Sequence, residues 1–452
     1  MVSIGPIWYV SKRSSIESRV NRSQAPGSRY GFAVMSTDTG HNASSGDGSW
    51  AYQQPEKVQN WGHRAMHGST VTAKTIVSSY YEKKISYNYY AGCSTGGRQG
   101  LKEAEYYPED FDGIIAGAPA WWTNHLQTTT VKIGQYNLPV DAPHHIPTAL
   151  FSAIGAEVLK QCDAQDGLKD SIISDPQGCV FRPEALLCPA NVTNQTAAGC
   201  LTAPQISTLE QIYNDYVGTN QTFLFPHLNM GSEVQWPVLL GGSAPNSLGT
   251  DFVKYFLNQG PNWSYTNFSE YYVQLADQLN PGNATVGFDL SAFHAKGGKI
   301  LSYHGQADGF IPTGSTPYYY NHVVRTLEPR GIDVNSFYRF FLVPGMGHCS
   351  NTFPIYNAPW YFAGPNQAPV LSPTAYGVPG FEDEEHDIMK AMMAWVEQGR
   401  EPEFIIGTKY ANETTQKGVI RQRPLCMYPK LAQYSGHGNV NASGSWECKE
   451  RY

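Results

Sequence analysis

One short segment limits what this chain can fold into more than any other part of it. Residues 85–92 are rich in tyrosine and read as a β-strand, Gly92-Cys-Ser-Thr-Gly96 follows directly, and residues 97–106 read as a helix. A Gly-x-Ser-x-Gly sequence between a strand and a helix is typical of a sharp turn that raises the serine hydroxyl above the end of a parallel sheet. The segment therefore predicts an α/β fold in which Ser94 is a nucleophile, with an inert glycine-rich turn as the alternative.

An oxyanion donor is predicted at the same turn. The residue that follows the nucleophile begins the helix, and its backbone N–H faces the developing oxyanion. Thr95 holds that position in this chain. The positive end of the helix dipole favours negative charge at the same place. Thr95 is therefore the predicted first donor of the oxyanion hole.

The rest of the chain supplies further strands for a parallel sheet. Four short apolar runs end at glycine or polar turns, which is typical of buried parallel strands. Helical periodicity separates them, as in residues 71–81 and 388–396, where Gly399 marks the end of the second helix. This alternation predicts an α/β fold with a doubly wound, mostly parallel sheet. The four runs are residues 31–36, 111–116, 299–303 and 337–343.

Residues 122–298 interrupt this alternation. They are rich in Asn, Pro, Gly and aromatic residues and contain four of the eight cysteines. We predict that they form an inserted lid domain, called the insert below, between two parts of a hydrolase core at residues 1–121 and 299–452. Aromatic side chains here either stack on an aryl ligand or build the core of the insert. They include Trp122, Trp236, Trp263, Tyr271 and Tyr272, together with Trp121 directly before the insert.

An acid and a base follow two of the predicted strands. His304-Gly-Gln-Ala-Asp308 comes after residues 299–303, and Gly345-Met-Gly-His348 comes after residues 337–343. The order Ser, Asp, His is that of α/β-hydrolases, in which the histidine takes the proton of the serine and the carboxylate stabilises the imidazolium. We therefore predict a triad of Ser94, Asp308 and His348. His304 and His41 also lie at strand ends and remain rival bases, although neither comes last in the chain.

The cysteines support this triad. Cys93 precedes Ser94 and Cys349 follows His348, so contact between serine and histidine would bring the two cysteines within bonding distance. The other six cysteines form neighbouring pairs whose short loops are easily closed. No Cys-x-x-Cys pair points to a structural zinc site. The four predicted disulfides are Cys93–Cys349, Cys162–Cys179, Cys188–Cys200 and Cys426–Cys448.

Cysteine and sequon content indicate the secretory pathway. Eight cysteines accompany a dense set of Asn-x-Ser/Thr sites. The first ten residues lack a basic segment and a cleavage site, so we interpret the start as truncated, with a cytosolic protein as the alternative. A net charge of -7 and the lack of a long apolar run exclude nucleic acid and membrane as partners. The sequons are at Asn21, Asn42, Asn191, Asn194, Asn220, Asn262, Asn267, Asn283, Asn412 and Asn441.

Several motifs together resemble the tannase and feruloyl esterase family of secreted fungal and bacterial hydrolases. The most specific are Cys93-Ser94, Asp308 and His348-Cys349, and the similarity extends over nearly everything after residue 30. It implies an α/β-hydrolase with a lid domain that cleaves esters of aromatic acids, and a disulfide between Cys93 and Cys349. The longer matching motifs are residues 36–41, 92–100, 107–120 and 423–429.

The N-terminus departs from the pattern of that family. Members carry a longer N-terminal region with a glycine-rich turn, upstream of the position of Gly31, which supplies the second oxyanion donor. Residues 11–29 contain no such turn, so the second donor is unassigned. Losing one donor typically lowers kcat about 10²- to 10³-fold. A catalytically impaired hydrolase fold acting as a binding glycoprotein is therefore the alternative to an enzyme.

An acidic loop between Cys162 and Cys179 is a candidate calcium site. Three carboxylates crowd around Gly167 and repel one another unless a cation neutralises them. Oxygen ligands at this spacing suit Ca²⁺, although a solvated acidic turn is the alternative. The resemblance implies a structural calcium ion in the lid at this motif. The implied ligands are the side chains of Asp163, Asp166 and Asp170 and the carbonyls of Leu168 and Ile172.

The substrate class follows from the resemblance, because the triad alone serves esters and peptides equally. Two substrates fit the family: feruloyl (hydroxycinnamoyl) esters of plant cell-wall polysaccharide and galloyl esters of tannins. We expect a secreted serine esterase that prefers the hydroxycinnamoyl ester, with tannase activity as the alternative.

Overall fold

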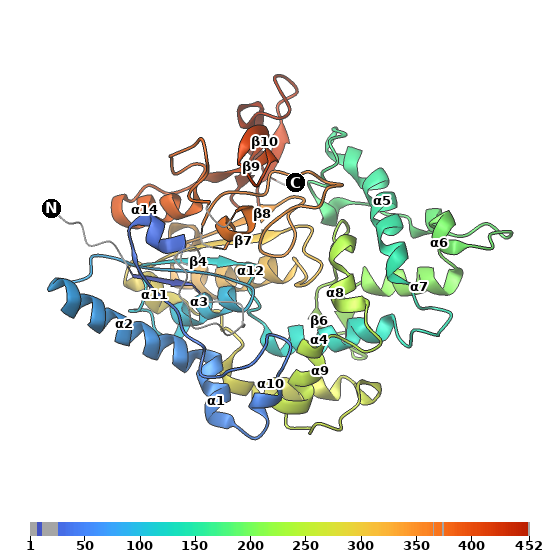
Figure 1. The fold of residues 1–452 in the computed structure, drawn as a ribbon, viewed down its shortest axis with the longest axis horizontal. Coiled ribbons are helices and arrows are strands. Elements are labelled where there is room, and N and C mark those ends of the chain that lie inside the picture. The colour runs from blue at the N-terminus through green and yellow to red at the C-terminus, as the bar shows by residue number, and fades with distance from the viewer. Residues whose placement is uncertain (1–6, 11–25, 365, 373–374, 451–452) are drawn as a thin grey trace.

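The computed structural model describes residues 7–10, 26–364, 366–372 and 375–450. Its centre is a six-stranded sheet in the order β2-β1-β3-β4-β7-β8 (Figure 1). All strand pairs in this sheet are parallel, and helices cover both faces, so the predicted α/β class is confirmed. The six strands are β1 (Ile7–Val10), β2 (Ala33–Met35), β3 (Asn88–Cys93), β4 (Gly113–Gly117), β7 (Lys299–Gly305) and β8 (Tyr338–Val343).

Side chains along β3 alternate between two hydrophobic cores, as the two-residue period of a strand requires. Tyr89 and Ala91 pack with α14 (Ile388–Gln398) on one face of the sheet. Tyr90 packs with α3 (Thr95–Tyr106) on the other face. Figure 1 shows α14 above the strands and α3 below them. Burial on both faces explains why the strands read as apolar runs in the sequence.

Strand β1 is the one strand of the central sheet that the sequence does not predict. It lies between β2 and β3, with Ile7 paired to Ala33 on one side and to Asn88 on the other. The four residues of β1, Ile-Trp-Tyr-Val, all favour a strand, but parallel pairing joins segments that are far apart in the chain, so the neighbours of this strand cannot be predicted from it. The predicted helix at residues 71–81 is longer in the structure, whereas Gly399 ends α14 in a left-handed conformation as expected.

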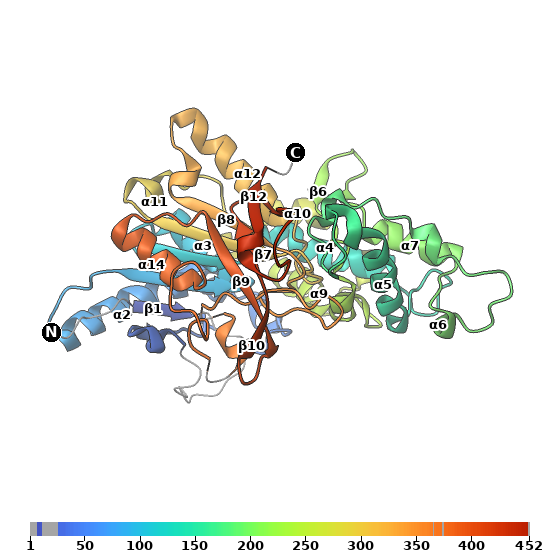
Figure 2. The ribbon, with the colours of Figure 1, turned by 90° about the horizontal axis from the view of Figure 1, so that it is seen from above.

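The insert contributes no described strand to the central sheet. Its helices and a two-stranded hairpin of β5 (Tyr216–Val217) and β6 (Phe223–Phe225) bury hydrophobic cores of their own. Figures 1 and 2 show it beside the sheet rather than stacked on one face. Phe293 already belongs to the core below the sheet, so packing returns to the hydrolase core before the predicted boundary at residue 298.

The remaining helices and strands fall outside the central sheet. Within the described residues, no helix is long and apolar enough to cross a membrane. The helices not yet given are α1 (Pro55–Gln59), α2 (Ala65–Tyr81), α4 (Thr123–Tyr136), α5 (Phe151–Cys162), α6 (Gln195–Ala198), α7 (Ala203–Ile212), α8 (Pro237–Leu240), α9 (Ser247–Asp251), α10 (Tyr271–Leu279), α11 (Ser291–Ala295), α12 (Ser315–Leu327) and α13 (Ala368–Leu371). The remaining strands are β9 (Phe404–Asn412), β10 (Lys417–Cys426), β11 (Leu431–Tyr434) and β12 (Trp446–Lys449).

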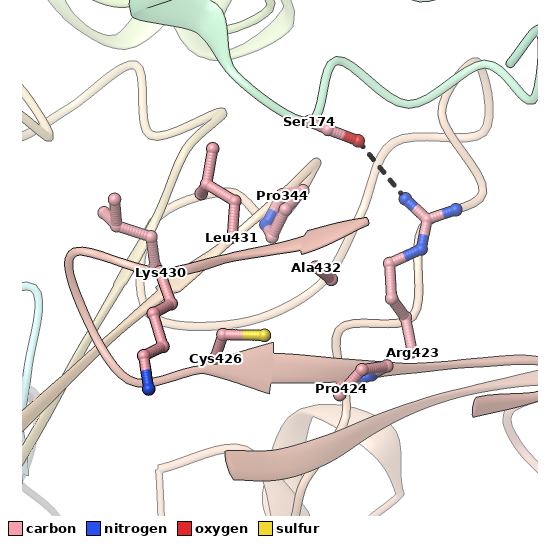
Figure 3. A pocket seen from close by; sticks show the side chains of 9 residues that line it. Ser174, Pro344, Arg423, Pro424, Cys426, Lys430, Leu431 and Ala432 are labelled. Carbon is pink, nitrogen blue, oxygen red and sulfur yellow. Dashed lines mark hydrogen bonds between the residues drawn. The ribbon is translucent and has the colours of Figure 1, made fainter. Parts of the chain in front are cut away.

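A buried arginine joins the C-terminal hairpins to the insert. Arg423 on β10 is 1% exposed, its guanidinium lies 3.7 Å from the ring centre of Trp446, and it forms an ion pair with Asp170 of the insert. One of its Nη atoms also donates to the hydroxyl of Ser174 at 3.4 Å (Figure 3). The cavity beside this contact measures ≈ 10 Å³, which is about the space of one water molecule. It is therefore far too small for an aromatic ester.

Candidate active site

Ser94 lies at a strained turn between β3 and α3. Its φ of 64° and ψ of -123° are unusual for a residue with a side chain. The turn is held from both sides, because Ser94 N donates to Gly117 O at 3.0 Å and Ala120 N donates to Ser94 O at 3.1 Å. A Cβ at Gly92 would lie 2.6 Å from the carbonyl oxygen of Gly96. Gly92 of the motif is therefore required by close backbone approach.

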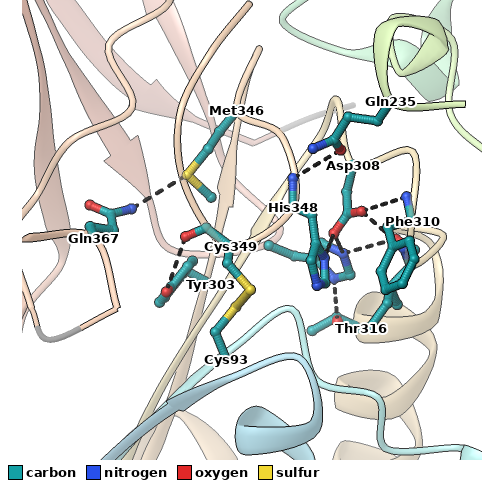
Figure 4. Close-up of a disulfide and its surroundings, with 12 residues drawn as sticks. Cys93, Gln235, Tyr303, Asp308, Phe310, Thr316, Met346, His348, Cys349 and Gln367 are labelled. Carbon is teal, nitrogen blue, oxygen red and sulfur yellow. Dashed lines mark hydrogen bonds and ion pairs between the residues drawn. A yellow bond between two sulfur atoms is a disulfide. The ribbon is translucent and has the colours of Figure 1, made fainter. Parts of the chain in front are cut away.

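The predicted acid and base are in direct contact. Nδ1 of His348 lies 2.7 Å from Oδ2 of Asp308 (Figure 4). The other carboxylate oxygen accepts the backbone N–H groups of Phe310 and Ile311, each at 2.9 Å. Asp308 is fully buried, whereas the side chain of His348 remains 15% exposed. The pair thus has the geometry of a buried orienting carboxylate and an accessible base.

Two histidines determine the charge of Asp308. Burial alone would raise the pKa of this carboxyl, but the charges and hydrogen bonds of His348 and His304 outweigh it. The net result is a pKa of Asp308 well below its usual range. Asp308 is therefore ionised at neutral pH, and it can stabilise an imidazolium that forms on His348.

His304, one of the rival bases, occupies the buried side of Asp308. Its Nε2 lies 3.1 Å from Oδ2 of Asp308 and its Nδ1 lies 2.7 Å from the hydroxyl of Thr316. With 0% exposure it has no access to a substrate, so it supports the carboxylate rather than acting as the base. The residues next to His304 and His348 do not show which of the two is the base, since both histidines follow a predicted strand. Burial separates them.

His41, the other rival base, packs away from this pair. Its ring stacks on Trp50 with 3.9 Å between ring centres, and its Nδ1 lies 3.2 Å from the hydroxyl of Thr39. Trp50 in turn contacts Phe256 of the insert. These contacts give His41 a packing role between the core and the insert. Of these three histidines, His348 alone is both in contact with Asp308 and partly exposed.

A disulfide connects the nucleophile turn to the base. Cys93 and Cys349 are bonded with a Cα–Cα distance of 5.9 Å (Figure 4), which places one covalent link next to both Ser94 and His348. The hydroxyl of Tyr303 donates to the carbonyl of Cys349 at 3.3 Å and supports the same loop. The structure contains the same four disulfides that the sequence predicts: Cys93–Cys349, Cys162–Cys179, Cys188–Cys200 and Cys426–Cys448.

The surroundings of Ser94 leave one oxyanion donor in place. Thr95 is exposed at the first position of α3, and its backbone N–H has no hydrogen-bond partner among the described residues. This N–H can therefore bind an oxyanion. Of residues 11–29, where the sequence shows no glycine-rich turn for a second donor, residues 11–25 lie outside the described part of the chain. Phe310, which the sequence analysis does not single out, packs on His348 with 5.0 Å between ring centres.

The predicted calcium ligands are partly brought together. One carboxylate oxygen of Asp163 accepts the backbone N–H groups of Asp170 at 3.2 Å and Ile172 at 3.1 Å. The carboxylate of Asp166 instead accepts the N–H of Leu168 at 3.0 Å and the hydroxyl of Ser174. The three carboxylates therefore share one loop but do not converge on one point.

The charge of this loop still favours a cation. Burial, followed by the negative charge of Asp170, raises the pKa of Asp163. Arg423 offsets part of this charge, through its ion pair with Asp170 and a weaker attraction to Asp166. A hard ion with oxygen ligands would offset the remaining repulsion. The donor set thus fits Ca²⁺ in chemistry, with Asp166 needing to turn from Ser174 to join it.

A second group of possible metal ligands is contributed by α2, α3 and the loop that follows α3. Within the described residues, His67, Glu103 and Asp110 form the one such cluster. Nδ1 of His67 lies 2.6 Å from Asp110, closer than two ligands of one ion, which stand about 3.3 Å apart in tetrahedral geometry. Burial, and then the negative charge of Asp110, raise the pKa of Glu103 well above its usual range. Lys74 also pairs with Asp110, so His67, Lys74 and Asp110 form an ionic network beside Glu103, whose two carboxylate oxygens have no hydrogen-bond partner in the described part of the chain.

Comparisons with known proteins agree over nearly the whole chain. A family model described as tannase and feruloyl esterase matches residues 9–233 and 255–449. The probable feruloyl esterase B-1 of Aspergillus flavus is 35% identical over 422 residues, which are 93% of this chain and 76% of that protein. The probable feruloyl esterase B of Aspergillus clavatus is 35% identical over 92% of this chain and 76% of its own length.

Solved structures give the same result. The crystal structure of feruloyl esterase B from Aspergillus oryzae has a TM-score of 0.87 and 32% identity, and the match covers 99% of this chain and 86% of that one. A tannin acyl hydrolase from Aspergillus niger has a TM-score of 0.75 and 22% identity, over 98% of this chain and 81% of that one. At this lower identity the second likeness concerns the fold alone.

Proposed function

The chain belongs to the tannase and feruloyl esterase family, and from this we propose that it hydrolyses hydroxycinnamoyl esters of plant cell-wall polysaccharide with Ser94, His348 and Asp308. The observation that carries the proposal is the 2.7 Å contact between His348 and the buried Asp308, joined by the Cys93–Cys349 disulfide to the strained turn of Ser94. The relatives at 35% identity are named as probable feruloyl esterases, which favours this substrate over a galloyl ester.

The mechanism follows from which atoms are accessible. The hydroxyl of Ser94 attacks the ester carbonyl while Nε2 of His348 takes its proton, because Nδ1 is already bound to Asp308. The N–H of Thr95 stabilises the oxyanion of the tetrahedral intermediate. The imidazolium of His348 then protonates the leaving alcohol. Water, activated by the same histidine, releases the aromatic acid and restores Ser94.

The aryl group of the substrate is expected near Phe310 rather than against the buried Trp121 and Trp236. Trp121 is 1% exposed and Trp236 is 0% exposed, so both build hydrophobic cores and cannot stack on a ligand. Phe310 is only half-buried and packs on His348. It can therefore contact an aromatic acyl group bound at Ser94. The four disulfides also suit a secreted enzyme, which would meet its substrate outside the cell.

A parallel rate comparison on methyl ferulate and methyl gallate tests the proposed substrate. We expect kcat/KM to be at least about tenfold higher on methyl ferulate, since one or two well-placed contacts to the acyl group give discrimination of that size. Hydrolysis of p-nitrophenyl acetate in the same buffer serves as the control for a working triad. A preference for methyl gallate would identify a tannase. No hydrolysis of any of the three esters would identify a binding protein with a hydrolase fold.

We also propose that the acidic loop holds a structural Ca²⁺ through Asp163, Asp166, Asp170 and the carbonyls of Leu168 and Ile172. The ion binds the folded insert but not the unfolded chain, so its removal by EGTA should lower the melting temperature by roughly 2–4 °C. Asp166→Ala should melt at the temperature of the EGTA-treated wild type and should not respond to EGTA. Scanning calorimetry with and without excess calcium measures both.

The exposed Asp141 of the insert provides the matched control for this experiment. Asp141→Ala removes one negative charge from the same part of the chain and should keep the response of the wild type to EGTA. Identical melting of the wild type with EGTA and with calcium would show that the loop is a solvated acidic turn.

A further inference from the structure

Gln235 brings one polar atom of the insert into the active site. It lies in a short 3-10 helix, Glu233–Gln235, and its Oε1 accepts two backbone N–H groups. These are the N–H of Gly309 at 3.0 Å and the N–H of His348 at 3.1 Å. Gly309 directly follows Asp308, so a single oxygen atom joins the loop of the acid to the loop of the base. Figure 4 shows the side chain of Gln235 reaching the backbone of His348.

Both loops carry a glycine where Gln235 approaches them. A Cβ at Gly309 would lie 2.8 Å from Cβ of Gln235 and 2.6 Å from the carbonyl oxygen of Ser232. A Cβ at Gly347 would lie 2.9 Å from Nε2 of Gln235. A side chain at Gly309 would collide with the backbone of the insert, and one at Gly347 would displace the amide of Gln235. The half-buried Gln235 therefore packs closely against both loops.

The segment that carries Gln235 is itself rigidly held. Nδ2 of Asn229 donates to the carbonyl of Gln306 at 3.1 Å, which makes another contact between the insert and the acid loop. The hydroxyl of Ser232 receives the indole N–H of the fully buried Trp236 at 2.9 Å. The buried Glu233 accepts the N–H of Gly231 at 2.8 Å. Gln235 thus projects from a segment with little freedom to move.

We propose that Gln235 is a positioning residue for the reaction, which holds the backbone of Asp308 and His348 in the geometry that catalysis requires. The inference rests on the proposed function, since it concerns the same reaction. It makes the insert part of the catalytic machinery and not only a cover for the substrate. A shift of about 1 Å in a reacting group can lower the rate about 100-fold.

The chemistry of an amide suits this place. Both N–H groups need an acceptor, because each would otherwise be left unsatisfied next to a substrate that excludes water. A carboxylate would also accept both hydrogen bonds, but it would add a negative charge beside the ion pair of Asp308 and His348. An aliphatic side chain of similar size would fill the space without accepting either bond. Glutamine supplies the acceptor and leaves the charge of the pair unchanged.

Three variants test the proposal with p-nitrophenyl acetate, an ester whose small acyl group does not depend on an aryl site. Gln235→Leu should lower kcat about 10- to 100-fold and leave KM within about twofold. Gln235→Glu keeps the acceptor and should retain most of the kcat at alkaline pH. In Gln235→Glu, the acid limb of the plot of kcat against pH should move to higher pH, because a carboxylate beside His348 favours its protonated form.

Gln135→Leu is the matched control. Gln135 is another half-buried glutamine of the insert, and its amide donates to the carbonyl of Tyr265 at 2.9 Å, in contact with neither loop of the triad. This variant should keep the kcat of the wild type. Melting temperatures of all variants separate a loss of positioning from a loss of folded protein.

The outcomes are distinguishable. A kcat of Gln235→Leu within twofold of the wild type, or an equal loss in Gln135→Leu, would overturn the inference. If Gln235→Leu does not fold, Gln235→Glu decides: an acid limb at the wild-type pH, or a kcat lowered as far at alkaline pH as at neutral pH, would overturn it. Failure of the wild type itself to hydrolyse the ester would refute the proposed function instead.

Discussion

Replacing Ser94 by alanine should lower kcat by about 10⁴- to 10⁶-fold on every ester the wild type cleaves. The reason is that the hydroxyl of Ser94 is the proposed nucleophile, and no covalent intermediate can form without it. The fold should survive, because the turn is held by backbone hydrogen bonds to Gly117 and Ala120 that do not involve the hydroxyl. Steady-state kinetics and a thermal scan of the same preparation measure the two effects.

Ser94→Gly sharpens this test. It removes the same hydroxyl, but glycine accepts the φ of 64° at this position without strain. The glycine variant should therefore be as inactive as the alanine variant and about 1 kcal/mol more stable than it. Ser264→Ala, which removes an exposed hydroxyl of the insert, is the control and should leave kcat unchanged. Activity of Ser94→Ala near that of the wild type would disprove the assignment of the nucleophile.

Asp308→Asn should lower kcat by about 10⁴-fold. The carboxylate faces both His348 at 2.7 Å and His304 at 3.1 Å, and an amide in its place cannot stabilise an imidazolium. KM should change little, since Asp308 is fully buried and has no access to a substrate. A loss of less than about tenfold in steady-state kcat would show that Asp308 is not the acid of the triad.

The same variant has a predictable effect on stability against pH. The pKa of Asp308 is depressed in the folded protein, so its ionised form stabilises the fold above the pKa of the unfolded chain. This contribution should be lost as the pH falls from about 4 towards the folded pKa. The difference in unfolding free energy between the wild type and Asp308→Asn should therefore be largest at neutral pH and shrink in acid. Urea unfolding at several pH values measures it, and a difference that grows in acid would contradict the charged state assigned to Asp308.

The features that the sequence predicts are those with local causes. The turn at Ser94 needs glycines at fixed spacing, and the strand and helix beside it have their own composition. Buried parallel strands read as apolar runs because both of their faces are covered. The disulfides Cys162–Cys179, Cys188–Cys200 and Cys426–Cys448 close loops of 17, 12 and 22 residues, where sequence proximity already favours the pairing.

The features that the sequence does not predict depend on contacts between distant segments. The place of β1 follows from parallel pairing with β2 and β3, which no property of four residues can specify. Chain order already favours His348 over His304 as the base, but the role of His304 as the buried support of Asp308 is visible only in the structure.

Gln235 shows the same limit most clearly. It lies 74 residues from Gly309 and 113 residues from His348, in a segment whose composition marks only an irregular insert. The chain itself thus determined the nucleophile turn, the order of the triad and the pairing of its cysteines, because each has a local or covalent cause. The supporting role of His304, and which residue of the insert holds His348, was decided by the tertiary structure, because hydrogen bonds and burial depend on distance in space and not along the chain.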